Sequence, residues 1–136
     1  NNDPGADQIL KAINALPQDR FRVIPSMRFA HFSELMKNAA VIVGNSSAGV
    51  REAPFLGIPS LDIGTRQARR SDAPSVTAAA AADRKAIDGF LHAEWGKHYE
   101  VHTGFGEGDA AGSFAALLER PEFWSRSFQK EFQDIG

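Results

Sequence analysis

A run of small and polar residues near the middle of the chain has the composition of an anion-binding turn. The segment Gly44-Asn45-Ser46-Ser47 follows the apolar run Ala39–Val43 and precedes a helical pattern. A buried strand that turns directly into a helix leaves backbone N–H groups unpaired at the helix start, next to the positive end of the helix dipole. Such a turn binds phosphate, and either Asn45 or Ser46 is suited to cap the helix.

Two further features of this segment bear on its use. Gly44 and Gly49 have no Cβ atom, so we expect another stretch of backbone to approach closely there. Glu52 lies about one and a half turns into the expected helix, where a carboxylate suits ribose hydroxyls. Taken alone, the segment is explained equally well as an ordinary strand–loop–helix connection with a serine cap.

Three arginines follow the next apolar strand. Beyond Ser60–Ile63 and Gly64, the chain continues Thr-Arg66-Gln-Ala-Arg69-Arg70. Ligands of open α/β sheets bind outside the carboxyl ends of the strands. The planar fork of a guanidinium group matches a diphosphate. The alternative interpretation is that these arginines are solvated surface charges.

The elements around these motifs alternate between helical and extended patterns. Strands that alternate with helices imply a parallel sheet with helices on both faces, which is a Rossmann-like α/β domain, expected over residues 1–120. The expected helices are Ala6–Leu16, Phe32–Asn38, Ala48–Leu56, Asp83–His92 and an Asp109-capped helix over Asp109–Glu119, and the expected strands are Phe21–Ile24, Val41–Val43, Ser60–Ile63 and Ser75–Ala78.

Residues 121–136 have a different character. Pro121 suits the first turn of a helix, and Trp124, Phe128 and Phe132 recur at helical spacing, with Phe123 and Ile135 nearby. We expect a terminal helix with an aromatic stripe over this segment.

Composition excludes several classes of function. The 136 residues carry 15 Lys and Arg against 17 Asp and Glu, so no basic surface for nucleic acid is expected. No apolar run is long enough to span a bilayer. Cysteine is absent and the 4 histidines show no metal-ligand spacing, so we expect no metal and no cofactor. These features are compatible with a cytoplasmic protein, the expected location.

The motifs resemble a known enzyme family. The segment Asn45–Pro54, followed by Gly57-Ile-Pro and Ile63–Gln67, closely resembles the carboxyl-terminal half of UDP-N-acetylglucosamine 2-epimerases, especially the hydrolysing type of sialic-acid pathways. The chain departs from the pattern at Arg69, where glycine is common. The resemblance extends to Arg22–Ser26 with Phe29, to Phe32–Ala39, to Trp95–Tyr99 and to Phe105–Ala110.

This resemblance implies a two-domain enzyme of the glycosyltransferase-B type that eliminates UDP from a UDP-2-acetamido sugar and hydrates the product. The chain would be its second half, with residues 121–136 crossing to the amino-terminal domain. The start at Asn1, without Met, also suggests a fragment. The catalytic carboxylates and histidine of the family lie in the other half, so we expect no catalytic residue here and no activity from this chain alone. A homo-oligomer is also expected.

The resemblance also assigns binding roles. Ser46 and Ser47 would hold the diphosphate, in a turn that also contains Asn45 and Gly49. Glu52 would bind the ribose, and Arg66 would neutralise the pyrophosphate. The segment from Met27 to Phe29 would recognise uracil. The UDP-binding residues expected from the sequence are Asn45, Ser46, Ser47, Gly49, Glu52, Arg66, Met27 and Phe29.

Two other functions stay open at this point. A glycosyltransferase donor domain uses the same architecture, with a glutamate for ribose and a cationic loop for diphosphate. A non-catalytic binding module with a degenerate site is the third possibility. The joint presence of Ser46, Glu52 and Arg66 argues against the degenerate site.

Overall fold

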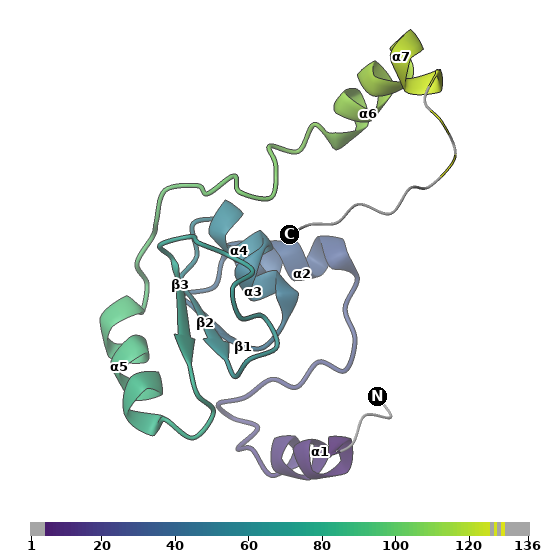
Figure 1. The fold of residues 1–136 in the computed structure, drawn as a ribbon. Helices are drawn as coiled ribbons and strands as arrows, with labels where there is room; N and C mark the ends of the chain where they lie inside the picture. The colour runs from purple at the N-terminus through teal and green to yellow at the C-terminus, as the bar shows by residue number, and fades with distance from the viewer. Residues whose placement is uncertain (1–4, 126, 128, 130–136) are drawn as a thin grey trace. The chain divides into compact units, whose positions relative to one another are not determined.

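The structure is a computed structural model that describes residues 5–125, 127 and 129 (Figure 1). The chain forms two compact units, Asn1–Asn38 and Ala39–Gly136, and each is described by itself. Among the described residues, no helix is both long enough and apolar enough to cross a membrane.

The first unit contains helices α1, Ala6–Asn14, and α2, Phe29–Lys37. α1 therefore ends two residues before the expected Leu16, and α2 begins three residues before the expected Phe32. The strand expected at Phe21–Ile24 is wrong: these residues are exposed and belong to no strand. A strand requires the backbone of a neighbour, and apolar alternation in one segment cannot supply it.

The second unit contains a parallel sheet, as the alternating pattern predicts. Strands β1, Ile42–Gly44, β2, Ser60–Ile63, and β3, Val76–Ala79, lie in the order β1-β2-β3, and all pairs are parallel. The bounds of β2 match the expectation, whereas β1 and β3 each begin one residue later than expected. The parallel α/β fold class is therefore confirmed.

Helices cover both faces of this sheet. On one face, helix α3, Ser47–Val50, lies so close that a Cβ atom at Gly49 would be 2.6 Å from Ser60 Oγ. On the other face, Leu61 is fully buried in a cluster with Phe90 of helix α5, Arg84–Glu94. Successive strand residues point to opposite faces, so the two helices lie on opposite sides of β2.

The single helix expected over Ala48–Leu56 is wrong, because the structure has two short helices there. α3 ends at Val50, and α4 spans Glu52–Phe55. At the junction, Arg51 has φ −112° and ψ −59°. Pro54 explains the break, because proline has no N–H to bond the carbonyl of Val50 and its ring crowds that carbonyl.

The segment after α5 returns over α4. The Tyr99 N–H donates to Gly57 O at 2.9 Å, and the His102 N–H donates to Pro54 O at 3.1 Å. Gly57 has φ +69°, and an added Cβ would collide with the carbonyl oxygen of Tyr99, so this contact requires glycine. The return segment therefore fixes the connection between α4 and β2.

Two helices close the described part of the chain: α6, Ala110–Leu118, and α7, Pro121–Trp124. Asp109 occupies the N-cap position of α6 as expected, but its side chain makes no capping hydrogen bond. Pro121 begins α7, as its sequence position indicates. Phe128, Phe132 and Ile135 of the expected aromatic stripe lie outside the described residues.

Candidate functional site

Two turns leave neighbouring strand ends of the sheet. Gly44 ends β1 and pairs in register with Asp62, one residue before the end of β2. Gly64 follows β2 with φ +93°, a conformation that favours glycine. A Cβ atom at either glycine would meet nothing within 4 Å, so this edge is open. The expected close approach of backbone at Gly44 is therefore wrong. At Gly49 the near atoms belong to the side chains of Ser60 and Ile42, so the close approach there is to side chains and not to backbone.

The turn after β1 has the geometry of a capped helix start. Ser46 is extended, with φ −74° and ψ 143°, and its Oγ accepts a hydrogen bond from the Ala48 N–H at 3.3 Å. Ser46 rather than Asn45 is thus the cap. Among the described residues, the backbone N–H groups of Ser46 and Ser47 have no hydrogen-bond partner. The residues Asn45, Ser46 and Ser47 are all exposed.

The helix behind this turn is short. α3 has 4 residues, about one turn, so its dipole is far smaller than that of the longer helix expected from the sequence. An anion at this turn would therefore depend on the free N–H groups and on neighbouring cations. Gly49 is buried, and its contribution is to let α3 pack against β2.

The loop after β2 supplies those cations and is joined to the turn by one side chain. Arg66, Arg69 and Arg70 are exposed, whereas Gln67 between them is only 3% exposed. Gln67 Nε2 donates to the carbonyl oxygen of Asn45 at 3.1 Å, and Gln67 Oε1 accepts from Arg70 Nη1 at 3.1 Å. Gln67 thus holds the turn after β1 beside the loop after β2 that carries the arginines.

The sequence interpretation did not assign Gln67 a role. A signal for one was available, because Gln67 is an uncharged polar residue with exposed cations on both sides. Its burial depends on the pairing of β1 with β2, which brings two distant turns together, so residue type alone could not reveal its partners.

A second contact links the loop after β2 to the segment that follows α5. His102 Nε2 lies 3.3 Å from Asp72 Oδ1 in the loop between β2 and β3. The Gly104 N–H donates to His102 Nδ1 at 3.4 Å, so both ring nitrogens of His102 have a contact. The return segment after α5 therefore supports the loop as well as α4.

Glu52 is the first residue of α4 rather than a residue inside one long helix. Its Oε2 atom is buried and has no hydrogen-bond partner among the described residues. The neighbouring Arg51 guanidinium lies 5.3 Å from the centre of the Phe105 ring, a cation–π contact that turns this charge toward the return segment. A buried carboxylate oxygen without a donor is a candidate to accept a ligand hydroxyl.

Further polar atoms are buried beneath this edge. Asp62, which is 4% exposed, has an Oδ1 atom without a partner among the described residues, and so do the hydroxyls of Ser60 and Ser75. Asp62 and Ser60 share one face of β2, the face that α3 covers. The sequence interpretation assigned no role to these residues.

The residues expected to recognise uracil lie in the first unit. Met27 lines an open hollow of about 430 Å³ beside α2, together with other apolar and polar side chains. Phe29 begins α2, is 67% exposed and does not line this hollow. The other lining residues are Arg22, Ile24, His31, Glu34, Leu35 and Asn38.

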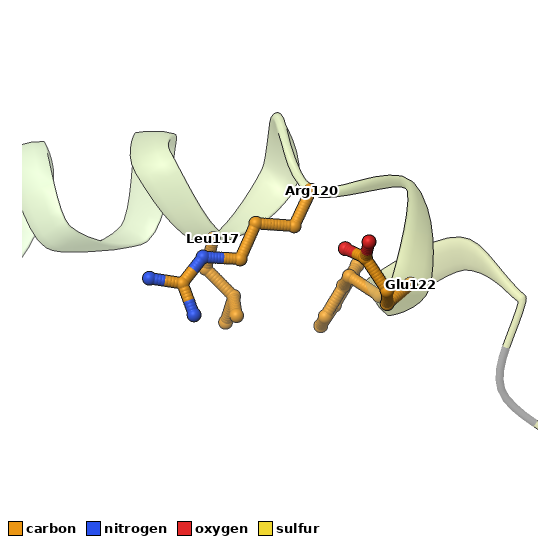
Figure 2. Close-up of a pocket in the computed structure, with 4 residues that line it drawn as sticks. Leu117, Arg120 and Glu122 are labelled. Atoms are coloured by element: carbon orange, nitrogen blue, oxygen red, sulfur yellow. The ribbon is translucent and has the colours of Figure 1, made fainter.

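A second hollow lies at the junction of α6 and α7. Figure 2 shows the side chains of Leu117 and Arg120 on one side of it and that of Glu122 on the other. Its volume is about 240 Å³, and Phe123 completes the lining. Among the described residues, no cluster of His, Asp or Glu side chains could hold a metal ion.

Comparisons with known proteins agree with the motif resemblance. A family model described as UDP-N-acetylglucosamine 2-epimerase matches residues 1–119. The UDP-N-acetylglucosamine 2-epimerase of Neisseria meningitidis serogroup B is 39% identical over 139 residues, covering 100% of this chain and 37% of that relative. The polysialic acid biosynthesis protein P7 of Escherichia coli is 32% identical over 77 residues, covering 56% of this chain and 20% of that relative. The chain thus spans well under two thirds of either relative's length.

Proposed function

Because this chain belongs to the UDP-N-acetylglucosamine 2-epimerase family, we propose that it is the UDP-binding half of a hydrolysing epimerase. The intact enzyme would eliminate UDP across C1 and C2 of a UDP-2-acetamido sugar and add water to the resulting glycal. The products are the 2-epimeric sugar and UDP. The observation that carries the proposal is the open edge where free N–H groups and arginines are held together by Gln67.

The diphosphate would bind at this edge. The unpaired N–H groups of the exposed residues Ser46 and Ser47 can donate to phosphate oxygens, and Arg66 supplies a charge-assisted partner from the neighbouring loop. Asn45 holds the turn through its carbonyl bond with Gln67, and Gly49 seats α3 against the sheet. The short helix makes the arginines more important than the helix dipole.

The nucleoside would use two other parts of the chain. The unpaired Oε2 of Glu52 is an acceptor for a ribose hydroxyl, which would satisfy its hydrogen-bonding capacity. The segment from Met27 to Phe29 is proposed to recognise uracil, and the open, mostly apolar hollow that Met27 lines supports a binding role for this segment.

These groups would also act on the reaction. UDP is the leaving group, so negative charge on its β-phosphate increases as the C1–O bond breaks. Donors and cations at that phosphate stabilise the transition state more than the bound substrate, and they therefore raise kcat. No side chain of this chain is proposed as the catalytic acid or base.

The remaining parts of the proposal concern the whole protein. We propose an amino-terminal domain that supplies the catalytic groups, and a segment 121–136 that crosses to it. The exposed Phe114 and Trp124, 60% and 61% exposed, are apolar surfaces that such a domain could cover. A homo-oligomer, a cytoplasmic location and inactivity of the isolated half belong to the same proposal. The comparisons do not favour the glycosyltransferase alternative.

The test is release of UDP from UDP-N-acetylglucosamine by the full-length protein, with the free sugar identified by NMR. We expect UDP and the free 2-epimer in equal amounts and without an added acceptor. Thermal stabilisation by UDP should exceed that by GDP, because stabilisation follows RT ln(1 + [L]/Kd).

Two results would contradict the proposal. Equal thermal stabilisation by UDP and GDP would contradict the proposal that the segment from Met27 to Phe29 recognises uracil. Transfer of the sugar to an acceptor, with no hydrolysis in its absence, would establish the glycosyltransferase alternative instead.

A further inference from the structure

We propose that Gln67 is a positioning residue that holds the Arg70 guanidinium at the diphosphate site, and that Arg70 is a second cation for the terminal phosphate of a nucleoside diphosphate. This inference rests on the proposed function. It adds Gln67, to which the sequence interpretation assigned no role, and it gives Arg70, one of three candidate arginines, a defined partner.

The chemistry of the bridge requires an amide. The carbonyl oxygen of Asn45 can only accept a hydrogen bond, and the guanidinium of Arg70 can only donate one. The Gln67 side chain meets both demands, with Nε2 toward Asn45 and Oε1 toward Arg70, each at 3.1 Å. Glutamate offers no donor at this position and methionine offers neither group, so neither can replace both bonds.

Burial makes the bridge rigid. Gln67 is 3% exposed with both ends of its amide paired, whereas Arg70 is exposed at its surface. A buried polar side chain that is hydrogen-bonded at both ends is held in one conformation. Arg70 is therefore anchored at one nitrogen while its other donors remain available to a ligand.

The backbone holds Arg70 from the same side. The Arg70 N–H donates to Gln67 O at 3.1 Å, which closes a turn over residues 67–70. Within this turn, Arg69 has φ +61°, a left-handed conformation that is uncommon for a residue other than glycine. Such a conformation persists where the surrounding structure enforces it. Arg70 is thus held to Gln67 by a backbone hydrogen bond and by a side-chain hydrogen bond, and the Gln67 amide in turn contacts the Asn45 carbonyl.

Pre-organisation explains why this arrangement would matter for binding. A free arginine loses rotamer entropy when it is ordered by a ligand, and that loss reduces affinity. An arginine that is already anchored loses less. Gln67 would therefore strengthen diphosphate binding through Arg70, without itself touching the ligand.

The test is a double-mutant cycle on the full-length protein, with UDP and uridine affinities measured by calorimetry. Gln67→Met and Arg70→Ala should each weaken UDP binding about tenfold, equivalent to about 1.4 kcal/mol, and leave uridine affinity unchanged. In the Gln67→Met background, Arg70→Ala should weaken UDP binding less than threefold further, because the two residues act as one unit. Gln8→Met, an exposed glutamine on α1, is the matched control and should change neither affinity.

Each other outcome decides against part of the proposal. Equal loss of UDP and uridine affinity in Gln67→Met would make Gln67 a structural residue. Two tenfold effects that multiply in the double variant would show that Gln67 does not act through Arg70. If Gln67→Met does not fold, Arg70→Ala decides alone, and unchanged UDP affinity in that variant overturns the inference. Failure of the wild type to bind UDP would overturn the proposed function as well.

Discussion

The interior of the sheet and its open edge differ in what their residues contact. In the interior, Leu61 and Phe90 are buried against each other, and α3 lies against Ser60 on the opposite face. At the edge, Ser46, Ser47 and Arg66 are exposed, and donors of the turn have no partner among the described residues. The apolar side chains around Leu61 bury one another, whereas the edge is left with donors and cations that a ligand would complete.

This difference separates two kinds of effect. Substitutions in the interior should change the free energy of unfolding and leave the intrinsic affinity of folded molecules intact. Substitutions at the edge should change affinity and leave stability intact. Gln67 is the exception, because it is buried like an interior residue and bonded to the edge.

The largest effect is expected from Leu61→Ala. The Leu61 side chain is 0% exposed and lies between Ala79 and Phe90, so its truncation leaves a cavity. Such substitutions cost about 2–5 kcal/mol of unfolding free energy. Denaturant unfolding of the full-length protein measures this cost, and Leu10→Ala, at a leucine 54% exposed on α1, is the control with a smaller expected loss. Equal losses in the two variants would contradict the assignment of the core.

A smaller effect, on binding alone, is expected at the edge. Arg66→Ala removes charge-assisted bonds to phosphate worth about 1.5–3 kcal/mol, so UDP affinity should fall while uridine affinity is unchanged. Glu52→Ala should weaken UDP and uridine equally, since both contain the ribose. Calorimetry with the two ligands distinguishes these patterns.

The rate of UDP release tests whether Arg66 acts in catalysis as well as in binding. If Arg66 acts on the departing phosphate, kcat for UDP release should fall in Arg66→Ala, whereas a purely binding role would raise KM alone. Arg84→Ala, at an exposed arginine that begins α5, is the matched control and should alter neither constant. An equal loss of UDP and uridine affinity in Arg66→Ala would remove its diphosphate role.

The sequence predicted those parts of the fold that depend on local pattern. β2 over Ser60–Ile63 and the helix expected over Asp83–His92 follow from apolar periodicity. The structure has β2 with these bounds and the helix as α5, Arg84–Glu94, with Asp83 as its cap. The strand at Phe21–Ile24 failed because pairing depends on a neighbour. The helix at Ala48–Leu56 failed because Pro54 acts on a carbonyl four residues earlier, which apolar periodicity does not register.

The site was predictable to a similar degree. Residue type and motif predicted binding roles for Ser46, Glu52 and Arg66, and these roles stay predictions. The structure places Ser46 at a cap and the Glu52 carboxylate in a partly enclosed position. Gln67 was missed because its partners come from another turn. Contacts between distant turns follow from strand order, and the sequence pattern alone does not specify their atoms.

The smallest effect is expected from a contact that supports the interior and lies away from the edge. The Tyr99 hydroxyl donates to Glu94 Oε2 at 2.7 Å, and Lys97 Nζ donates to Glu94 Oε1 at 3.0 Å. The bonds from Tyr99 and then Lys97 lower the pKa of Glu94, and the bond to Glu94 raises the pKa of Tyr99. The same tyrosine is bonded to Gly57 through its backbone, so the contact fastens the return segment to α5.

These shifts predict how stability depends on pH. The lowered pKa of Glu94 means that its contribution is present above its ordinary value of 4.5 and is lost as acid protonates the folded carboxylate. The raised pKa of Tyr99 means that its contribution is present below its ordinary value of 10.0 and is lost as the folded phenol ionises. Tyr99→Phe should therefore lower the midpoint of thermal unfolding slightly at neutral pH and show a weaker pH dependence at both extremes. UDP affinity at neutral pH should be unchanged, because the Tyr99 hydroxyl contacts Glu94 of α5 and is not part of the proposed UDP site. Parallel pH profiles of unfolding for the wild type and Tyr99→Phe would show that this bond does not stabilise the fold. A loss of UDP affinity in Tyr99→Phe would show that the return segment contributes to the UDP site.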